Sequence, residues 1–323
     1  MVLRGLPRNA VKRLLAGDAG HPRVVITENL LPDMNGTEMV RRMRHNDVIS
    51  DRSVPVIMIT SDPRVETVKE ARDAYAHTYW QLRQRKGITL YDAQRRMRER
   101  NYYAAMMVRE GDADAMISGY NRSYPNVLKP VLQVIDMEDG VNRVATTNLM
   151  ITNRGPLFIS DTSININPNA KDLAKIAQMT SYIAALFGIQ PKVAMLSYSN
   201  FGSSKNEDAQ KVSEAVKLAH RFLPDIAVDG PIQADFALNK TMLTNKFPFS
   251  KIAGAAVNTL VLPDLNAANI AYKLIKELDD ALSIGPIMMG LKHPAHILQL
   301  GASVDEIVHM TAVAAVDAQN KKI

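Results

Sequence analysis

Apolar runs that alternate with helical segments place the strongest constraint on the fold of this chain. Runs of strand length stand at residues 24–26, 54–60, 193–198 and 259–262, and a stretch with helical periodicity follows each of them. Strands that alternate with helices build a parallel sheet with helices on its faces. In such sheets, ligands bind outside the carboxyl ends of the strands. The sequence therefore predicts an α/β fold with its sites in the Gly-, Ser- and Asn-rich loops after the strands.

The same patterns predict one hairpin and a series of helices. Residues 148–152 and 157–160 are apolar and flank a turn with the sequence NRGP, which predicts a β-hairpin. Helical periodicity, bounded by capping or breaking residues, predicts helices over residues 37–44, 66–85, 89–109, 125–135, 171–187, 208–222, 266–277 and 303–319.

The amino-acid composition excludes several classes of protein and cofactor for this chain. The 323 residues include no Cys, which excludes disulfides, Cys-ligated zinc, iron–sulfur clusters and thiol catalysis. Hydrophobic residues make up 46% of the chain, which is enough to bury a core. No stretch has the length and apolar character of a membrane span, and the N-terminus has no signal-peptide core. We therefore expect a cytoplasmic protein with no membrane partner and no metal.

The net charge of +6 falls on the first part of the chain, where residues 1–125 hold 21 Lys and Arg against 15 Asp and Glu. Such an excess suits a phosphate-bearing ligand or another subunit, and a merely solvated surface is the alternative. The arginines between residues 95 and 100 point around most of one predicted helix, and no nucleic-acid-binding motif accompanies them. We expect no nucleic-acid partner.

Three loop features carry candidate chemistry. Residues 197–204, SYSNFGSS, follow a predicted strand and precede a helix, so their hydroxyls and backbone N–H groups suit either an anion or simple helix capping. The chain has neither a Walker loop nor a Gly-x-Gly-x-x-Gly fingerprint, which gives no indication of a nicotinamide site. Asp235 is interpreted as a base, a ligand acceptor or a helix cap. His293 and His296 are interpreted as polar loop residues, because Pro294 between them disfavours a regular helix of metal ligands.

Several segments together resemble one enzyme family, the phosphotransacetylases. The strings are GDADAMISG at residues 111–119, the serine loop, DGPIQ at 229–233, LPDLNAANIAYK at 262–273 and IGP at 284–286. The likeness covers about residues 62–319 and is nearest to the phosphotransacetylase-like C-terminal domain of multidomain NADP-dependent malic enzymes, through residues 83–87, 97–102 and 316–319.

This resemblance implies two α/β/α sandwich domains with a cleft between them, a phosphotransacetylase or isocitrate-dehydrogenase-like fold. The implied first domain is discontinuous, with residues 1–138 plus 286–323, and the second holds residues 139–285. The positions that the resemblance assigns to ligand binding are Ser123, Lys129, Ser197, Ser199, Ser203, Gln233, Asp235, Asn266, Asn269, Gly285, Pro286, Gln299 and Glu306.

One string departs from the family. Phosphotransacetylases carry an Asn-Asp-Leu-Ser-Arg-Gly string whose Ser and Arg are catalytic, and here Gln299 and Leu300 stand at those two positions. A family arginine is matched by Lys129 and a family aspartate by Glu306. Leucine cannot supply the charged clamp that a phosphate needs, and loss of one preorganised donor costs about 10²–10³ in rate. We therefore expect no catalytic residue in this chain.

The expected function is a catalytically degenerate domain of a malic enzyme that binds acetyl-CoA or CoA as an allosteric sensor and mediates oligomerisation. The alternative is an active phosphate acetyltransferase, which converts acetyl-CoA and phosphate into acetyl phosphate and CoA. The implied partners are acetyl-CoA or CoA, a second copy in a dimer or larger homo-oligomer, and a malic enzyme catalytic domain in the full-length protein. No covalent cofactor is implied.

The N-terminal segment departs from the phosphotransacetylase pattern. Residues 24–75 resemble part of a response-regulator receiver domain, through LPDMNG at 31–36 and VPVIMIT at 54–60. Glu28 takes the place of the phosphoacceptor aspartate, and the early acidic metal pair is absent, so we expect no working phosphorylation site. A chimera, a divergent start and chance similarity stay open as explanations.

Overall fold

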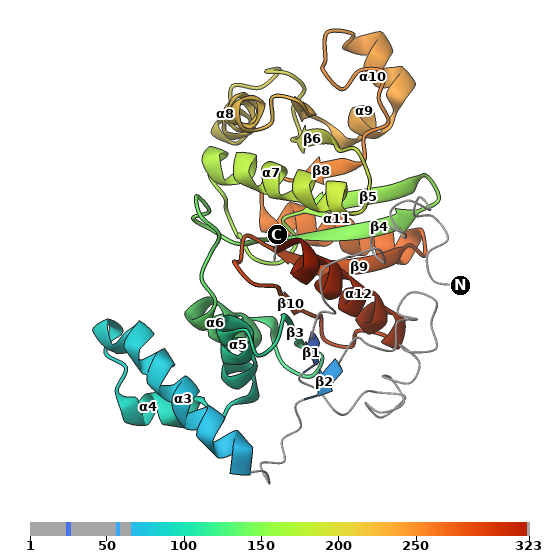
Figure 1. Cartoon of the computed structure of the whole chain (residues 1–323). Helices are drawn as coiled ribbons and strands as arrows, with labels where there is room; N and C mark the ends of the chain where they lie inside the picture. The colour runs from blue at the N-terminus through green and yellow to red at the C-terminus, as the bar shows by residue number, and fades with distance from the viewer. Residues whose placement is uncertain (1–23, 27–55, 59–65, 322–323) are drawn as a thin grey trace. The chain divides into compact units, whose positions relative to one another are not determined.

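Two separate β-sheets organise the part of the chain that the structure describes (Figure 1). The structure is a computed structural model that describes residues 24–26, 56–58 and 66–321, with side chains from residue 71 onward. Its described residues fall into two units. Residues 141–290 form the unit called unit 1 here, and the described residues up to 140, together with 291–321, form unit 2.

The sheet of unit 1 has six strands in the order β7-β6-β8-β5-β4-β9. Neighbours among β7, β6, β8 and β5 are parallel, whereas β4 is antiparallel to both β5 and β9. The pairing of β4 with β5 confirms the predicted hairpin. The strands are β4 (Ala145–Thr152), β5 (Gly155–Ser160), β6 (Lys192–Leu196), β7 (Ala227–Ile232), β8 (Thr259–Val261) and β9 (Leu282–Met289).

Helices cover both faces of this sheet, with α7 in front of it and α11 behind it in Figure 1. Helix α7 begins with a capping box, in which the Asn169 side chain accepts from the Asp172 backbone N–H and the Asp172 side chain accepts in return. The helices of unit 1 are α7 (Ala170–Leu186), α8 (Glu207–Phe222), α9 (Ala234–Leu238), α10 (Lys240–Lys246) and α11 (Leu265–Leu278).

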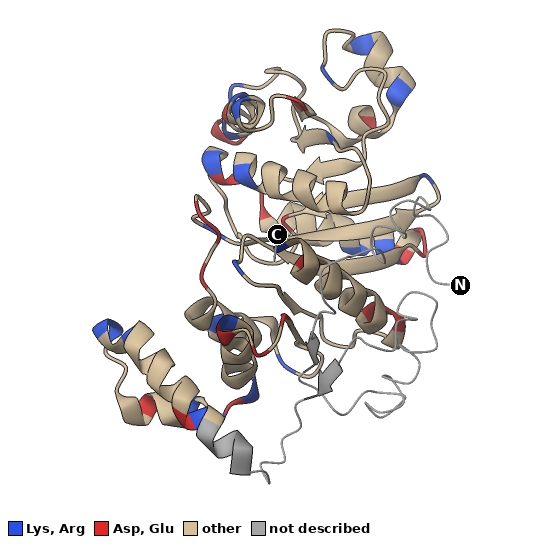
Figure 2. Ribbon diagram, in the orientation of Figure 1, with Lys and Arg blue, Asp and Glu red and all other residues tan. Residues whose placement is uncertain are grey.

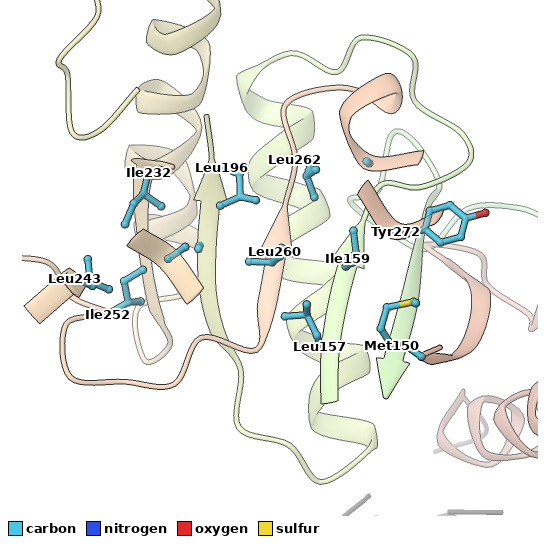
Figure 3. Packing of buried hydrophobic residues seen from close by; sticks show 14 residues of the cluster. Met150, Leu157, Ile159, Leu196, Ile232, Leu243, Ile252, Leu260, Leu262 and Tyr272 are labelled. Carbon is cyan, nitrogen blue, oxygen red and sulfur yellow. The ribbon is translucent and has the colours of Figure 1, made fainter. Parts of the chain in front are cut away.

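The two faces are packed by alternate residues of the same strands, as a pleated strand requires. Leu157 and Ile159 of β5 join one hydrophobic cluster, whereas Phe158 between them meets Phe187 beyond α7 in an edge-on ring contact. Figure 3 shows this cluster, which reaches from Met150 of β4 across the sheet to the α9–α10 segment and includes Tyr272 of α11. The cluster supports the strand ends from which the loops of unit 1 emerge.

Unit 2 has a parallel sheet in the order β10-β3-β1-β2. The parallel pairing of β1 with β2 agrees with the prediction from the strand–helix–strand pattern at the start of the chain. The strands are β1 (Val24–Ile26), β2 (Val56–Met58), β3 (Ala115–Ser118) and β10 (Ala295–Ile297). The helices are α3 (Glu66–Arg83), the short 3₁₀ helix η1 (Gln84–Lys86), α4 (Leu90–Arg96), α5 (Arg100–Glu110), α6 (Tyr124–Val134) and α12 (Val304–Lys321).

One predicted helix is wrong, because residues 89–109 form α4 and α5 with a break between them. At the break, the backbone N–H groups of Arg98 and Glu99 donate three residues back, to Arg95 and Arg96. Arg96 ends α4 and donates to the hydroxyls of Tyr79 and Tyr102 at 2.7 and 3.2 Å. Helical periodicity continues across the break in the sequence, and only these tertiary contacts reveal it.

Other predictions concern segments outside the described residues. They are the helix predicted at 37–44, the receiver-like string at 31–36 and Glu28. Of the strand predicted at 54–60, only residues 56–58 are described. Within the described part of the chain, no helix combines the length and the apolar character needed to cross a membrane. In Figure 2 the ribbon is coloured at Lys, Arg, Asp and Glu mainly along helices and loops, whereas the strands outside the grey segments carry almost no such colour.

Candidate functional site

The loops of unit 1 that carry predicted site residues leave the same edge of its sheet. Strands β5, β6, β7 and β8 are parallel, so their carboxyl ends meet at one edge. The loops that follow them start at Asp161, Ser197, Gln233 and Leu262. The structure therefore brings together the serine loop, Gln233, Asp235 and the amino end of α11, as the strand pattern predicts.

The serine loop is organised by its own hydroxyl groups. Ser199 is buried, and its Oγ accepts from the Ser204 backbone N–H at 3.1 Å and lies 3.0 Å from the Oγ of Ser203. Ser203 also accepts from the Asn200 backbone N–H at 3.1 Å. Ser197 accepts from the Ser199 backbone N–H at 3.3 Å and is partly exposed. Ser199 thus shapes the loop, while Ser197 and Ser203 present hydroxyls near the surface.

An amide pair locks the serine loop to the end of β7. The Asn200 side chain donates to the Gln233 side chain at 2.8 Å and accepts from the Gln233 backbone N–H at 2.8 Å. Gln233 also donates through Nε2 to the Tyr198 carbonyl at 2.7 Å. Gln233 therefore fixes the loop, and sequence analysis missed Asn200 because an isolated Asn in a polar loop carries no distinctive pattern.

Polar residues at the start of α11 and α9 complete this edge. Asn269 of α11 donates to the Thr162 carbonyl at 3.0 Å, which ties α11 to the loop after β5. That loop is wound around the buried Asp161 carboxylate, which accepts from the backbone N–H groups of Thr146 and Asn165 at 3.0 and 2.8 Å. Asn266 and Asp235 are exposed in the first turns of α11 and α9. These two side chains can meet a ligand, whereas Asp161 and Asn269 hold the backbone in place.

Gly285 and Pro286 do not join this group. They lie inside β9, four strands away from β6, which corresponds to about 19 Å at the usual strand spacing. Gly285 has φ +149°, and a Cβ there would come within 2.8 Å of Asn148 Nδ2. The glycine leaves room for the Asn148 side chain, which donates to Ser283 at 3.1 Å. Within unit 1, Gly285 and Pro286 are part of strand β9 and contribute to the packing of the sheet.

In unit 2, the structure brings the glycine loop after β3 to the loop after β10. The two strands are parallel neighbours, with Ser118 beside Ile297. Gly119 has φ +113°, and a Cβ there would come within 2.6 Å of the Leu298 carbonyl oxygen, so only glycine allows this approach. Gln299 and Leu300 follow directly, and Leu300 is 66% exposed. Ser123 begins α6 in the neighbouring loop, and its side chain makes no capping hydrogen bond.

Two further predicted residues of unit 2 have distinct positions. Lys129 is exposed on α6. Glu306 forms a reciprocal cap with Ser303 at the start of α12: its carboxylate accepts from the Ser303 backbone N–H at 2.7 Å, and the Ser303 hydroxyl accepts from the Glu306 backbone N–H at 3.2 Å. The cap gives Glu306 a structural task that the motif match did not indicate.

His296 is not the polar loop residue that the sequence suggested, because it is fully buried in β10. Its Nε2 lies 3.6 Å from Asp317 Oδ2, and Asp317 lies 3.8 Å from the Lys321 amine, which also pairs with Glu138 at 2.9 Å. Burial raises the pKa of Asp317 to about 6 and lowers that of His296 to about 3. His293 is half-buried, and burial lowers its pKa also.

A small cavity near the start of α7 was not indicated by any motif. Its volume is about 20 Å³, which is room for about one water molecule, and nine residues that include Arg143, Lys171, Lys175 and Asp172 line it. Arg143 Nε lies 3.6 Å from the Asp172 carboxylate, and Lys175 donates to Gln178 at 2.9 Å. No cluster of three metal-ligating side chains occurs among residues 71–321.

Comparison with known proteins identifies the family. The profile of the family described as Phosphate acetyl/butaryl transferase matches residues 39–315, and the chain belongs to this family. The chain is 39% identical over 257 residues to the phosphate acetyltransferase of Thermoanaerobacterium thermosaccharolyticum, an alignment that covers 77% of this chain and 78% of that protein. It matches a phosphotransacetylase from Streptococcus pyogenes with a TM-score of 0.81 and 30% identity, over 96% of this chain and 97% of the other.

Some relatives are considerably longer than the matched region. The chain is 37% identical over 250 residues to the phosphate acetyltransferase of Nitratidesulfovibrio vulgaris, but the match spans only 35% of that protein. It is 39% identical over 244 residues to an NADP-dependent malic enzyme of Haemophilus influenzae, of which it spans 32%. The family match begins at residue 39 and so includes much of the segment that resembles a receiver domain.

These findings correct the expected function. The expectation of a degenerate, sensing domain of a malic enzyme is wrong, because curated phosphate acetyltransferases and solved phosphotransacetylases match along most of the chain. The expectation relied on Gln299 and Leu300, which are only two positions of the match. The alternative, an active transferase, has the better support.

Proposed function

We propose that this chain is a phosphate acetyltransferase, which moves an acetyl group between phosphate and the thiol of coenzyme A. The similarity to the T. thermosaccharolyticum enzyme, over more than three quarters of both chains, is the observation that carries the proposal. The loops at the carboxyl edge of the unit 1 sheet give it a chemical basis, because hydroxyl, amide and backbone N–H groups are concentrated there. Such donors suit phosphate and acyl oxygens.

In the direction of thioester formation, the sulfur of coenzyme A attacks the carbonyl carbon of acetyl phosphate. The bond between that carbon and the phosphate oxygen breaks, phosphate leaves, and the thiol proton passes to the phosphate or to water. Leu300 supplies no charge to the leaving phosphate, and anion binding in unit 1 is assigned to the serine loop. Ser197 and Ser203 donate to substrate oxygens, and Ser199, Asn200 and Gln233 keep them in position.

The test is the coenzyme A-dependent consumption of acetyl phosphate by the purified chain, followed through the thioester. Ser197→Ala and Ser203→Ala each lower kcat/KM about tenfold or more, because each removes one donor to charge that develops in the transition state. Ser213→Ala, in the middle of α8, is the matched control and leaves the rate unchanged. No turnover by the wild-type chain, with phosphate and acetyl phosphate both tested at millimolar concentration, contradicts the proposal.

A second pair of substitutions examines the departure at the end of β10. The double change Gln299→Ser and Leu300→Arg restores the residues of the family string, and we expect it to raise kcat at least tenfold, because it adds a charged clamp for phosphate. An unchanged rate in an active wild-type chain shows that transfer in this protein uses other groups.

The chain binds coenzyme A as a substrate, in keeping with the chemistry of its family, and it assembles as a homo-oligomer. The similarity to the H. influenzae malic enzyme supports the use of a module of this kind in longer malic enzyme chains.

A further inference from the structure

A lysine amine lies at the edge of the unit 1 sheet where the site loops meet. Lys211 is in the second turn of α8, the helix that follows the serine loop. Its amine donates to the Asn167 side-chain oxygen at 2.9 Å and to the Pro263 carbonyl at 3.1 Å. Asn167 belongs to the loop after β5, and Pro263 belongs to the loop after β8. The amine therefore joins the segments that follow β6, β8 and β5, which are three neighbouring strands of the sheet.

The positive charge of Lys211 has no acidic partner among the residues that the structure describes. Both of its acceptors are neutral, and no ion pair joins it to Glu207, which stands one turn earlier on α8. By contrast, Lys217 on the same helix is exposed, and its amine lies 3.6 Å from the Glu214 carboxylate. Lys211 is only partly exposed, so water and salt screen its charge less than that of a surface lysine. A cation held by neutral groups in this way is available to an anionic ligand.

The groups around the amine leave donors for such a ligand. An ammonium group has three N–H donors, and the two hydrogen bonds use two of them. Because an ammonium can only donate, the exposed Asn167 side chain presents its oxygen to Lys211 and keeps its NH₂ group as a further donor beside the amine.

The helix ends at this edge add positive potential. Helices α7, α8 and α11 all begin here, because each of them follows a strand whose carboxyl end lies at this edge. The amino end of a helix carries a partial positive charge. Two acidic side chains near these ends are occupied as caps: Asp264 accepts from the Ala267 backbone N–H at 2.9 Å, and Asp172 accepts from the Asn169 backbone N–H at 3.2 Å.

We propose that Lys211 is the cation of an anion-binding site at the carboxyl edge of the unit 1 sheet, and that its ligand is a phosphate group. The inference rests on the proposed function, in which phosphate groups come from two sources, the acetyl phosphate side of the reaction and the nucleotide half of coenzyme A. The serine loop supplies hydroxyl groups at the same edge, and Lys211 supplies the charge that hydroxyl groups lack.

The test measures ligand binding by the full chain, apart from turnover. Differential scanning fluorimetry at constant ionic strength follows the rise in melting temperature with inorganic phosphate and, separately, with coenzyme A, and so yields each dissociation constant. Lys211→Gln removes the charge but keeps amide donors for Asn167 and Pro263. We expect it to raise the dissociation constant of one of the two ligands about tenfold, because a charge-assisted hydrogen bond is lost. The melting temperature without ligand stays unchanged.

Lys217→Gln is the matched control, because it removes the same charge from an exposed site on the same helix, and it leaves both dissociation constants unchanged. Weaker binding of inorganic phosphate in Lys211→Gln places the acetyl phosphate side of the reaction at Lys211. Weaker binding of coenzyme A alone places a phosphate of its nucleotide half there. Unchanged dissociation constants for both ligands, or a wild-type chain that binds neither, overturn the proposal.

Two further variants separate the charge of Lys211 from its role in holding the loops. Asn167→Asp keeps an acceptor for the amine but neutralises its charge, and we expect it to weaken phosphate binding as much as Lys211→Gln does. Lys211→Arg keeps the charge and binds within a few-fold of wild type. An Asn167→Asp variant that binds like wild type, or a Lys211→Arg variant as weak as Lys211→Gln, shows that the ligand does not use this charge, and the proposal is then wrong.

Failure of this inference is distinguishable from failure of the proposed function. An active chain in which Lys211→Gln binds both ligands like wild type keeps the proposed function and loses this site. A chain without turnover whose phosphate binding depends on Lys211 keeps the site and loses the proposed function.

Discussion

The buried pair of His296 and Asp317 shows how two titratable side chains can offset each other. Burial disfavours the charged form of both, so the folded protein holds Asp317 protonated and His296 neutral at mildly acid pH. The unfolded chain has the reverse distribution, with an ionised carboxyl above pH 3.8 and a protonated imidazole below pH 6.5. Both states then bind one proton in total between about pH 4 and 6. The two contributions to the pH dependence of stability therefore cancel.

Removal of either partner uncovers the contribution of the other. In His296→Asn only Asp317 remains, whose pKa is raised, so the free energy of unfolding falls as the pH rises from about 4 to 6. In Asp317→Asn only His296 remains, whose pKa is lowered, so stability falls as the pH drops from about 6.5 to 4. In each variant the free energy of unfolding changes by about 3 kcal/mol over its pH window, because a shift of one pKa unit corresponds to about 1.4 kcal/mol.

Urea unfolding at a series of pH values measures both slopes against the wild-type chain, whose profile stays flat in this window apart from its other groups. Parallel profiles for the wild type and both variants contradict this account of the pair. Because His296 sits three residues before Gln299, the pair also fixes the strand that leads into the second group of site residues.

At the scale of elements, the amide lock between the serine loop and β7 decides how rigid the candidate site is. Asn200→Ala removes two side-chain hydrogen bonds to Gln233, and we expect a loss of about 1–2 kcal/mol in the free energy of unfolding. Hydrogen exchange of residues 198–204 accelerates by an order of magnitude, because the loop opens without unfolding unit 1.

Asn206→Ala is the matched control for this prediction, because it removes a cap of α8 outside the lock. It destabilises α8 by a similar amount but leaves exchange in residues 198–201 unchanged. Equal acceleration in both variants, or none in Asn200→Ala, contradicts the role given to the lock.

Elements with a strong local signal could be predicted from the sequence, and those set by tertiary contacts could not. Helical periodicity continues over a long stretch in α7, which also begins with a capping box. The hairpin of β4 and β5 has a typical turn sequence, NRGP, between its strands. Strand β9 was missed because Gly285 and Pro286 interrupt it, and β10 because three residues after a proline carry little pattern.

In the candidate site, too, features with a local sequence signal could be predicted and features set by tertiary contacts could not. The loops after parallel strands were located correctly, since one edge collects every carboxyl end. The burial of His296 and the lock through Asn200 depend on partners 21 and 33 residues away, which no local pattern encodes.

For the whole molecule, the proposed homo-oligomer makes thermal stability depend on concentration. Mass action favours the folded assembly, so we expect the melting temperature to rise by a few degrees when the protein concentration increases a hundredfold. Differential scanning fluorimetry at several concentrations measures this rise. A constant melting temperature contradicts the proposed self-association.

Unit 2 is assembled from chain on both sides of unit 1, and this sets an order of events during synthesis. Ribosomes deliver residues 141–290 before Ala295–Ile297, the strand that completes the second sheet beside β3. The embedded unit can therefore form its core while the earlier half of its neighbour still lacks its last strand. A polypeptide released before residue 295 keeps every strand of the unit 1 sheet but lacks β10, so the side of β3 that pairs with β10 is left unpaired. Premature termination here therefore creates an open strand edge and a hazard for aggregation.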